Sequence, residues 1–201
     1  DWHSERANTT GLLLQKASHD IDVLHWLCGG YTRRVNAMGA LTVYHEVADR
    51  RRPDERGNPE FRFENWPPRT QKGLSPVIDV EDLSMMQMEL DNGVLCCYQQ
   101  CCYTPDAWRN YTIIGTEGRI ENFGDDPPLA ELRVWNRRTG YNGDADERYP
   151  ISAEAGSHGG GDPKIVREFI RYVLRGGPTT TSPVASRNSV AAGYLATRSL
   201  R

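Results

Sequence analysis

Two side chains three residues apart, Lys16 and His19, give the clearest signal for chemistry in this sequence. His19 falls in the first turn of a helix that the sequence predicts over residues 18–28. The backbone N–H groups at a helix start disfavour a protonated imidazole, and the charge of a nearby Lys16 acts in the same direction. A neutral imidazole can take a proton from an alcohol, so His19 is a candidate general base. The alternative is a structural histidine that caps the helix or bonds to a core carbonyl.

A second candidate group lies late in the chain, where His158 and Asp162 flank three consecutive glycines. Asp162 suits the N-cap of a helix with Pro163 at its first position, and His158 fits a loop. The glycines do not form a dinucleotide-binding fingerprint. No G-x-G-x-x-G occurs, and the run neither follows a clear strand nor opens a βαβ unit. We therefore expect no cofactor-binding residues in this chain.

The cysteines indicate neither a disulfide framework nor a metal site. Their number, five, is odd, and four of them form two adjacent pairs, so reduced thiols in a cytoplasmic protein are the simpler interpretation. In a strand, Cys97 and Cys101 would share one face but lie roughly 13 Å apart. One zinc ion cannot reach both from a straight strand, so we expect small buried hydrophobic residues and no metal.

The elements that must position these residues come in the order helix, several antiparallel strands, then helices. The apolar residues of the first helix cover most of its circumference, which predicts deep burial. Asn92-Gly93 predicts a hairpin turn between two alternating runs. The strands are expected at 33–46, 83–90, 94–103, 109–114, 119–123 and 132–136. Helices that follow antiparallel strands predict an α+β fold, with helices packed on one face of a sheet.

Two more helices are expected near the end of the chain. The first starts at about Asp162, carries an apolar stripe that includes Phe169 and stops at Gly176-Gly177-Pro178. The second runs from about Val184. Its inward-facing residues are expected to be Val190, Ala191, Tyr194 and Leu195.

Length and charge narrow the classes of protein to which this chain could belong. The chain has 201 residues and a formal net charge of -3, which gives no electrostatic case for nucleic acid or an anionic membrane. No apolar run approaches the ~20 residues of a membrane helix. We expect one domain over residues 1–201, with a long loop or insertion at about 48–78. A start at Asp1 without Met, and an end inside a helical pattern at Arg201, suggest a piece of a longer protein.

Three segments together resemble a known family. The first is Gly11-Leu12-Leu13 followed by Lys16-x-x-His19-Asp20-x-Asp22-x-x-x-Trp26-Leu27-x-Gly29, the second is residues 111–120, and the third is His158-Gly159-Gly160-Gly161-Asp162-Pro163 followed by Phe169 and Gly176. In this order they resemble the second domain of the Gfo/Idh/MocA oxidoreductases. The resemblance covers about residues 11–201.

The resemblance implies a substrate-binding domain with a large, open, mainly antiparallel sheet and helices on one face. It implies a separate Rossmann domain for NAD or NADP, with no cofactor bound to this fragment alone. The expected substrate is a sugar, polyol or related CH–OH compound, oxidised by hydride transfer. The open sheet face implies a homodimer or higher homo-oligomer. The resemblance implies that His19 is the catalytic acid/base or the residue that orients the substrate.

The sequence departs from the family at one position in this motif. Many members carry Asp four residues before the histidine, where this chain has Gln15, so a His–Asp relay there is in doubt. Gln15 and Lys16 are expected to bind substrate, with Lys16 bonding to a hydroxyl. His158 and Asp162 are also expected at the substrate, and Trp2 and His3 would touch a sugar ring unless the N-terminus is loose.

Two other functions stay open at this point. The first is an NAD-dependent glycoside hydrolase of the same fold, which cleaves glycosides through a transient oxidation. The second is a non-catalytic dimerisation module.

Overall fold

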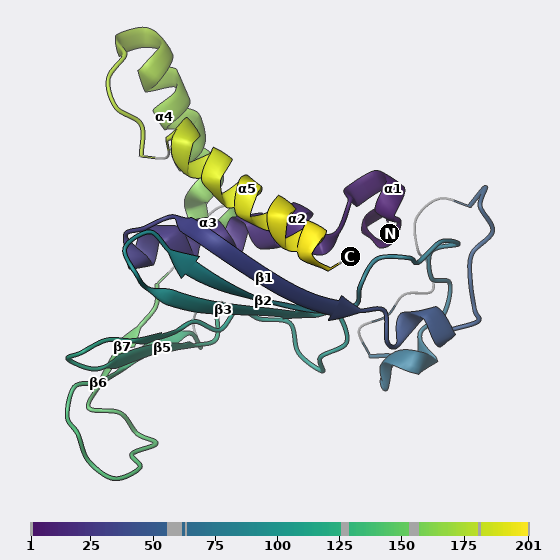
Figure 1. Ribbon diagram of the computed structural model, residues 1–201, viewed down its shortest axis with the longest axis horizontal. Helices are drawn as coiled ribbons and strands as arrows, with labels where there is room; N and C mark the ends of the chain where they lie inside the picture. The colour runs from purple at the N-terminus through teal and green to yellow at the C-terminus, as the bar shows by residue number, and fades with distance from the viewer. Residues whose placement is uncertain are drawn as a thin grey trace. The chain divides into compact units, whose positions relative to one another are not determined.

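The computed structural model describes residues 2–55, 62, 64–125, 129–152, 157–180 and 182–200 (Figure 1). The chain folds into two compact units, one formed by Asp1–Pro105 with Thr180–Arg201 and the other by Asp106–Thr179. Each unit has its own antiparallel sheet, one of three strands and one of four. The antiparallel architecture with helices on one side confirms the predicted fold class, although the described strands form two sheets rather than one.

The first unit is built on a sheet in the order β1-β2-β3, formed by β1 (Thr32–Ala40), β2 (Leu83–Leu90) and β3 (Leu95–Cys101). The predicted hairpin between β2 and β3 is confirmed. Gly93 has a φ of 86° and donates its N–H to the carbonyl of Leu90 at 3.0 Å. A positive φ suits glycine because it has no Cβ.

Three helices cover one face of this sheet: α2 (Leu12–Gln15), α3 (Ala17–Cys28) and α5 (Pro183–Ser199) (Figure 1). Alternate residues of the strands point toward them, so Met86 and Met88 are buried while Met85 and Gln87 are exposed. The core cluster between the two layers consists of Leu13, Ala17, Ile21, Ala37, Met86, Met88, Leu90, Cys96, Ala192 and Ala196.

Helix α5 packs through small residues, which corrects the expected inward face. Tyr194 and Leu195 are 45% and 50% exposed, and the buried residues are Ser189, Ala192, Gly193, Ala196 and Thr197. A Cβ added to Gly193 would lie 2.4 Å from the carbonyl oxygen of Leu13. The backbones of α5 and α2 therefore approach so closely that only glycine fits, and the larger apolar residues face outward.

Helix α3 is buried on one face only, which corrects the expected deep burial. Ala17 and Ile21 are fully buried, whereas Trp26 is 78% exposed and Leu27 is 42% exposed. The helix ends at Gly29 in the left-handed conformation, as expected. It begins one residue earlier than expected, at Ala17, so Ser18 lies inside the helix.

Strand β1 ends at Ala40, although the sequence predicted a strand up to residue 46. The reason is Asp82, whose carboxylate accepts the backbone N–H groups of Thr42, Val43 and Tyr44 at 2.7, 2.8 and 2.9 Å. Amides that bond to a side chain are not available to a strand ladder. The chain instead enters the short 3-10 helix η2 (Tyr44–Glu46).

In the described part of residues 48–78 the chain has little regular structure, but it is held in place. Arg51 is 8% exposed, and its backbone N–H donates to the carbonyl of Leu74 at 2.9 Å. The N–H of Gly73 donates to Asp49 at 2.9 Å, and the buried side chain of Gln71 donates to the carbonyls of Arg62 and Asn65. One 3-10 helix, η3 (Pro68–Thr70), lies in this segment.

The second unit has a sheet in the order β4-β5-β6-β7, formed by β4 (Thr112–Ile114), β5 (Arg119–Phe123), β6 (Glu131–Trp135) and β7 (Glu147–Pro150). Strand β7 was not predicted. Strand β4 is shorter than expected because the buried side chain of Asn122 bonds to the backbone before it. Asn122 accepts the N–H of Tyr111 at 2.5 Å and donates to the carbonyl of Arg109 at 2.6 Å.

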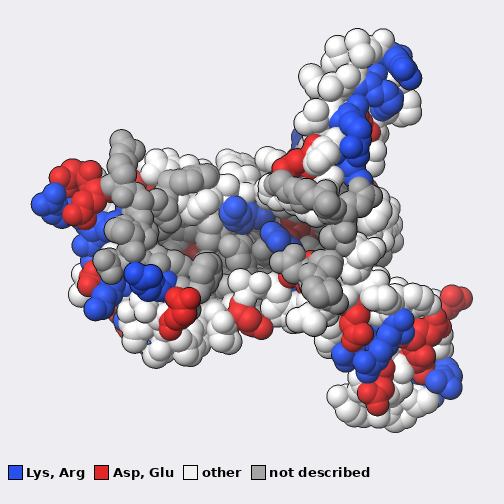
Figure 2. Space-filling model, turned by 180° about the vertical axis from the view of Figure 1, so that it is seen from behind, with Lys and Arg blue, Asp and Glu red and all other residues white. Residues whose placement is uncertain are grey.

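The second unit also contains the 3-10 helix η4 (Ser157–Gly160) and helix α4 (Gly161–Arg175). The apolar stripe of α4 is confirmed as a helical pattern, but Phe169 and Leu174 on it are 66% and 74% exposed. Basic side chains run along the same helix (Figure 2). Asp162 is the second residue of α4 and Gly160 is its N-cap, so the expected capping role of Asp162 is wrong.

Candidate functional site

The candidate site of the first unit lies at the junction between α2 and α3, where Lys16 separates the two helices. The N–H of Lys16 donates to the carbonyl of Leu12 at 2.8 Å, and the N–H of His19 donates to the carbonyl of Lys16 at 3.2 Å. On either side of the junction, Leu13 and Ala17 are fully buried against the sheet. The core therefore fixes the backbone that carries Lys16 and His19.

Lys16 and His19 both have exposed side chains. Residues three apart on a helix are neighbours on its surface, so the two side chains share one side of the junction. An exposed ammonium and an exposed imidazole can both reach a small molecule without disturbing the core. Sequence spacing predicted this pair, and the structure presents both members to solvent.

Gln15, the residue before Lys16, is half-buried, and its Oε1 atom is buried with no hydrogen-bond partner among the described residues. A buried acceptor without a partner costs free energy, because the amide loses its hydrogen bonds to water. A donor such as a ligand hydroxyl would satisfy this oxygen. Gln15 thus adds a hydrogen-bond acceptor to the exposed ammonium and imidazole.

His3, which the family resemblance also placed at the substrate, lies near Lys16 of this group. It lies in the 3-10 helix η1 (Trp2–Ser4), and burial and then the charge of Lys16 lower its pKa. The segment that carries it is anchored. Ser4 Oγ donates to the carbonyl of Val77 at 2.8 Å, and Ser4 O accepts the N–H of Asp79 at 3.0 Å. The lowered pKa keeps the imidazole of His3 neutral at physiological pH.

Arg6, in helix α1 (Arg6–Thr9), completes this anchor. Its backbone N–H donates to Asp79 Oδ1 at 2.6 Å, and its guanidinium forms an ion pair with Glu81 at 2.6 Å. These contacts join residues more than seventy positions apart in the chain. Ser4 and Arg6 are therefore fixed beside the residues that precede β2, so of the two alternatives left open for this segment the loose one is wrong.

Asp20, next to His19, ties the start of α3 to the sheet. Its carboxylate is buried, with the residue 8% exposed, and accepts the hydroxyl proton of Tyr98 on β3 at 3.1 Å. A buried carboxylate with a hydroxyl donor is held in one orientation. This contact fixes the first turn of α3, in which His19 lies, and Tyr98 was not singled out from the sequence.

His25 is a structural histidine at the other end of α3. It is 3% exposed, and its Nε2 accepts the backbone N–H of Thr32 at 3.1 Å. Because Nε2 is an acceptor, the proton of the neutral ring is on Nδ1. Burial lowers the pKa of His25. It fastens the end of α3 to the start of β1 and is not accessible to a ligand.

His158 and Asp162 lie in the second unit and contact each other. His158 Nδ1 lies 2.9 Å from Asp162 Oδ1, and both side chains are exposed. His158 has a φ of 51°, in the left-handed region that few residues other than glycine adopt. The structure thus brings these two predicted residues together, and their role at a substrate stays a prediction.

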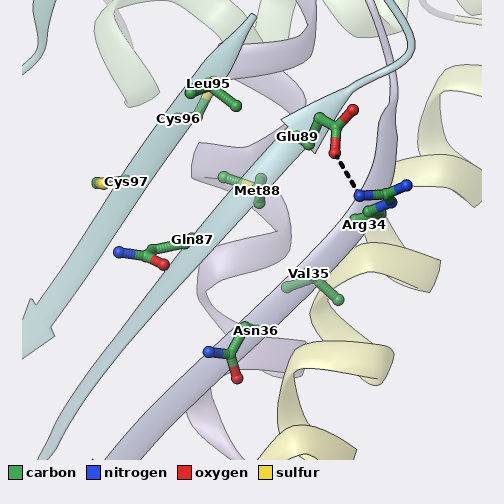
Figure 3. A pocket seen from close by; sticks show the side chains of 9 residues that line it. All are labelled: Arg34, Val35, Asn36, Gln87, Met88, Glu89, Leu95, Cys96 and Cys97. Carbon is green, nitrogen blue, oxygen red and sulfur yellow. Dashed lines mark ion pairs between the residues drawn. The ribbon is translucent and has the colours of Figure 1, made fainter. Parts of the chain in front are cut away.

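A hollow in the first unit lies on the strands and not at this junction. It has a volume of about 450 Å³ and spans β1, β2 and β3 on a surface that includes the ion pair between Arg34 and Glu89, 3.4 Å long (Figure 3). None of the predicted site residues lines it. Among the described residues there is no group of three His, Cys, Asp or Glu that could hold a metal ion, and no helix long and apolar enough to cross a membrane.

The described residues do not suit a dinucleotide. Every strand pairing within the two sheets is antiparallel, and the glycines at 159–161 belong to η4 and to the start of α4. A dinucleotide site of the Rossmann type needs parallel strands with a glycine-rich turn between strand and helix. We therefore derive no step through a nicotinamide from the residues of this chain.

Comparison with known families accounts for the antiparallel sheets of the described residues. Residues 1–201 match the model of the Gfo/Idh/MocA proteins described as "Oxidoreductase family, C-terminal alpha/beta domain". The chain belongs to this family. The resemblance inferred from the three sequence segments is thereby confirmed, and the chain is an oxidoreductase C-terminal domain.

Individual relatives agree with this assignment. The chain is 24% identical over 214 residues to the putative oxidoreductase YteT of Bacillus subtilis (strain 168), an alignment that covers 84% of this chain and 48% of YteT. Among solved structures, it is similar to levoglucosan dehydrogenase in complex with NADH and L-sorbose, with a TM-score of 0.67, 20% identity, and coverage of 100% of this chain and 51% of the other.

A second solved structure, UDP-N-acetylglucosamine 3-dehydrogenase GnnA from Acidithiobacillus ferrooxidans, gives a TM-score of 0.62 at 15% identity, with coverage of 94% of this chain and 49% of the other. At these identities the structural matches establish the fold. This Gfo/Idh/MocA chain spans about half the length of the curated relative that it matches.

Proposed function

We propose that this chain is the substrate-binding domain of an NAD(P)-dependent oxidoreductase that acts on a CH–OH group of a sugar, polyol or related compound. The observation that carries the proposal is the α2–α3 junction. It presents an exposed imidazole and an exposed ammonium beside a buried amide oxygen that needs a donor. Similarity to sugar dehydrogenases supports the substrate class.

In this proposal each residue at the junction has one task. His19 takes the proton of the reacting hydroxyl, which requires a neutral imidazole within reach of the substrate. Lys16 donates hydrogen bonds to substrate oxygens, and Gln15 accepts one from a hydroxyl. The oxidising cofactor, NAD or NADP, binds to a part of the protein outside this chain. The substrate role that we assign to His158 and Asp162 rests on the family resemblance alone.

The exposed apolar face of α3 agrees with a cofactor-binding domain outside this chain. Trp26, Leu27 and Val23 are 78%, 42% and 36% exposed on the helix whose first turn carries His19. Exposed apolar surface of this kind marks an interaction site. We propose that the cofactor-binding domain packs there. The free cysteines suit reduced thiols in the cytoplasm.

The test is turnover by the full-length protein. Incubation with NAD+ or NADP+ and a panel of aldoses and polyols is expected to form reduced nicotinamide with at least one substrate. The isolated 201-residue chain is expected to show no turnover and no micromolar binding of NADH or NADPH by calorimetry. Full-length protein that reduces neither cofactor with any panel member, or tight binding of NADH by the isolated chain, would overturn the proposal.

The alternative reaction, NAD-dependent hydrolysis of glycosides, is distinguished by its product. An NAD-dependent glycoside hydrolase would release p-nitrophenol from nitrophenyl glycosides without net formation of reduced nicotinamide. We favour net oxidation, because the similar solved structures include dehydrogenases and an aldose–aldose oxidoreductase. Release of p-nitrophenol by the full-length protein would favour the hydrolase instead.

We also propose that a second copy of this chain covers the open face of the sheet β1-β2-β3. Met38 and Leu95 are 65% and 78% exposed on this face, and Arg34 and Glu89 supply both charge signs beside them. A surface that holds exposed apolar groups and paired opposite charges is complementary to its own copy under twofold symmetry.

The proposed dimer predicts that a charge introduced on the open face weakens the association of the two copies. In sedimentation under reducing conditions the chain is expected to form a dimer, and Leu95→Glu is expected to weaken the dimer at least about tenfold, because it buries a carboxylate in the interface. Tyr141→Glu is the matched control, since Tyr141 is 99% exposed and lies in the second unit. A monomeric wild-type chain, or equal weakening by both substitutions, would contradict this assembly.

A further inference from the structure

Two of the five cysteines meet between helix α3 and strand β3. Cys28 is the last residue of α3 and is half-buried, and Cys96 on β3 is 9% exposed. Cys28 packs against the core cluster that contains Cys96. The Cys28 thiol lies near enough to Cys96 to help raise the pKa of the Cys96 thiol. The remaining cysteines on this strand and after it, Cys97, Cys101 and Cys102, take no part in the core cluster.

The end of α3 is held against the hairpin that carries Cys96. The side chain of Asn92, in the turn between β2 and β3, donates to the carbonyl of Cys28 at 2.8 Å. A Cβ added to Gly30 would lie 2.7 Å from the same Asn92 side chain, so the chain after the helix also lies close to the turn. Cys96 follows this turn at a position that faces the helices, whereas Cys97 faces the opposite side of the sheet.

We propose that Cys28 and Cys96 are an oxidation site, at which a small-molecule disulfide such as oxidised glutathione converts the two thiols into an intramolecular disulfide. The reaction consists of two thiol–disulfide exchanges. The Cys28 thiolate attacks one sulfur of glutathione disulfide, which forms a mixed disulfide and releases one glutathione. Cys96 then loses its proton and attacks the Cys28 sulfur, which releases the second glutathione. Two thiols are oxidised, and one glutathione disulfide is reduced to two glutathione molecules.

The environment sets the order of the two steps. Burial, together with the neighbouring Cys28 thiol, raises the pKa of Cys96 to about 12, so this thiol stays protonated and lies out of reach of the oxidant. Only the thiolate is nucleophilic, so the half-buried Cys28 is the thiol that reacts first. Because the disulfide joins α3 to β3, it adds a covalent bond where Asn92 now holds the helix end by a hydrogen bond. The product is a helix fastened to the sheet at the end opposite His19.

The experiment uses a variant in which only these two thiols remain, with Cys97→Ser, Cys101→Ser and Cys102→Ser. After treatment with oxidised glutathione, alkylation of the unfolded chain is expected to detect neither of the two thiols, and peptide mapping is expected to find Cys28 joined to Cys96. The midpoint of thermal unfolding is expected to rise and to return after reduction by dithiothreitol.

The matched control keeps Cys28 and Cys97, with Cys96→Ala, Cys101→Ser and Cys102→Ser. It is expected to give a glutathione adduct on Cys28 or Cys97 without an internal link, because Cys97 faces away from the helix. Persistence of both thiols in the first variant, a lasting glutathione adduct on Cys28 there, or an equal yield of internal links in the control would overturn the proposal. Peptide mapping of the wild-type chain repeats the test without any substitution, so a variant that fails to fold does not decide the outcome.

Discussion

His19→Ala in the full-length protein is expected to lower kcat roughly 10²- to 10⁴-fold, the contribution of a positioned general base. The side chain of His19 is exposed, so its removal leaves no cavity and should leave the fold intact. The split between kcat and KM separates a catalytic role from a role in binding. The variant should lose kcat with little change in KM for the substrate, whereas a role in binding alone would raise KM.

His45→Ala is the matched control, because His45 is another exposed histidine of the first unit, in η2. Its kcat is expected to change less than about twofold, as for a surface position. Circular dichroism of both variants should match the wild type. Wild-type turnover by His19→Ala would show that the base lies elsewhere, and His3 would be the next residue to test, since burial and then the charge of Lys16 lower its pKa.

The parts of the fold that follow from local signals could be predicted from the sequence. Asn92-Gly93 fixed the hairpin between β2 and β3 because a turn with a positive φ needs glycine at that point. Gly29 and Gly176 ended their helices for a similar local reason. These elements depend on residues within a few positions, so a single sequence is sufficient for them.

The errors lie where distant residues decide the structure. Asp82 ends β1 because its carboxylate accepts backbone N–H groups about 40 residues earlier in the chain. No sequence pattern near residue 42 indicates this contact. The buried face of α5 was predicted from its largest apolar residues, whereas Gly193 and its small neighbours make the contact with α2. Close backbone approach depends on what a helix meets, and that partner comes from the other end of the chain.

In the candidate site, too, local spacing could be predicted from the sequence and contacts between distant segments could not. Lys16 and His19 were predictable because their spacing places both on one side of a helix start. The expectation for His3 came from the family resemblance and not from spacing, since its position depends on contacts of Ser4 and Arg6 with residues more than seventy positions later. The buried contact between Asp20 and Tyr98 also joins two distant segments. Spacing thus identified the exposed chemical groups, and tertiary contacts determined which neighbours hold them.

Asp82→Ala is expected to cost about 3–5 kcal/mol of the free energy of unfolding, because it leaves several buried donors without an acceptor. Asp82 is 4% exposed, and its carboxylate accepts three backbone N–H groups and the hydroxyl of Thr42 at 2.8 Å. Urea unfolding followed by circular dichroism measures the loss. Asp144→Ala is the matched control, since the side chain of Asp144 is 95% exposed, and it should change stability by less than about 0.5 kcal/mol.

The pH dependence of stability tests the cause of this effect. Burial alone would raise the pKa of Asp82, but the amides of Thr42, Tyr44 and Val43 and the hydroxyl of Thr42 together hold it below the usual 3.8. A carboxyl group with a lowered pKa in the folded state stabilises the fold fully above the pKa of the unfolded chain. That stability is lost as the pH falls through the folded value. The wild type should therefore lose stability below about pH 4, and Asp82→Asn, which is destabilised but cannot titrate, should lose less over the same range. An equal loss in both proteins would show that this carboxylate is not the group that senses acid. In that case the four hydrogen bonds at the end of β1 would stabilise the fold without responding to pH.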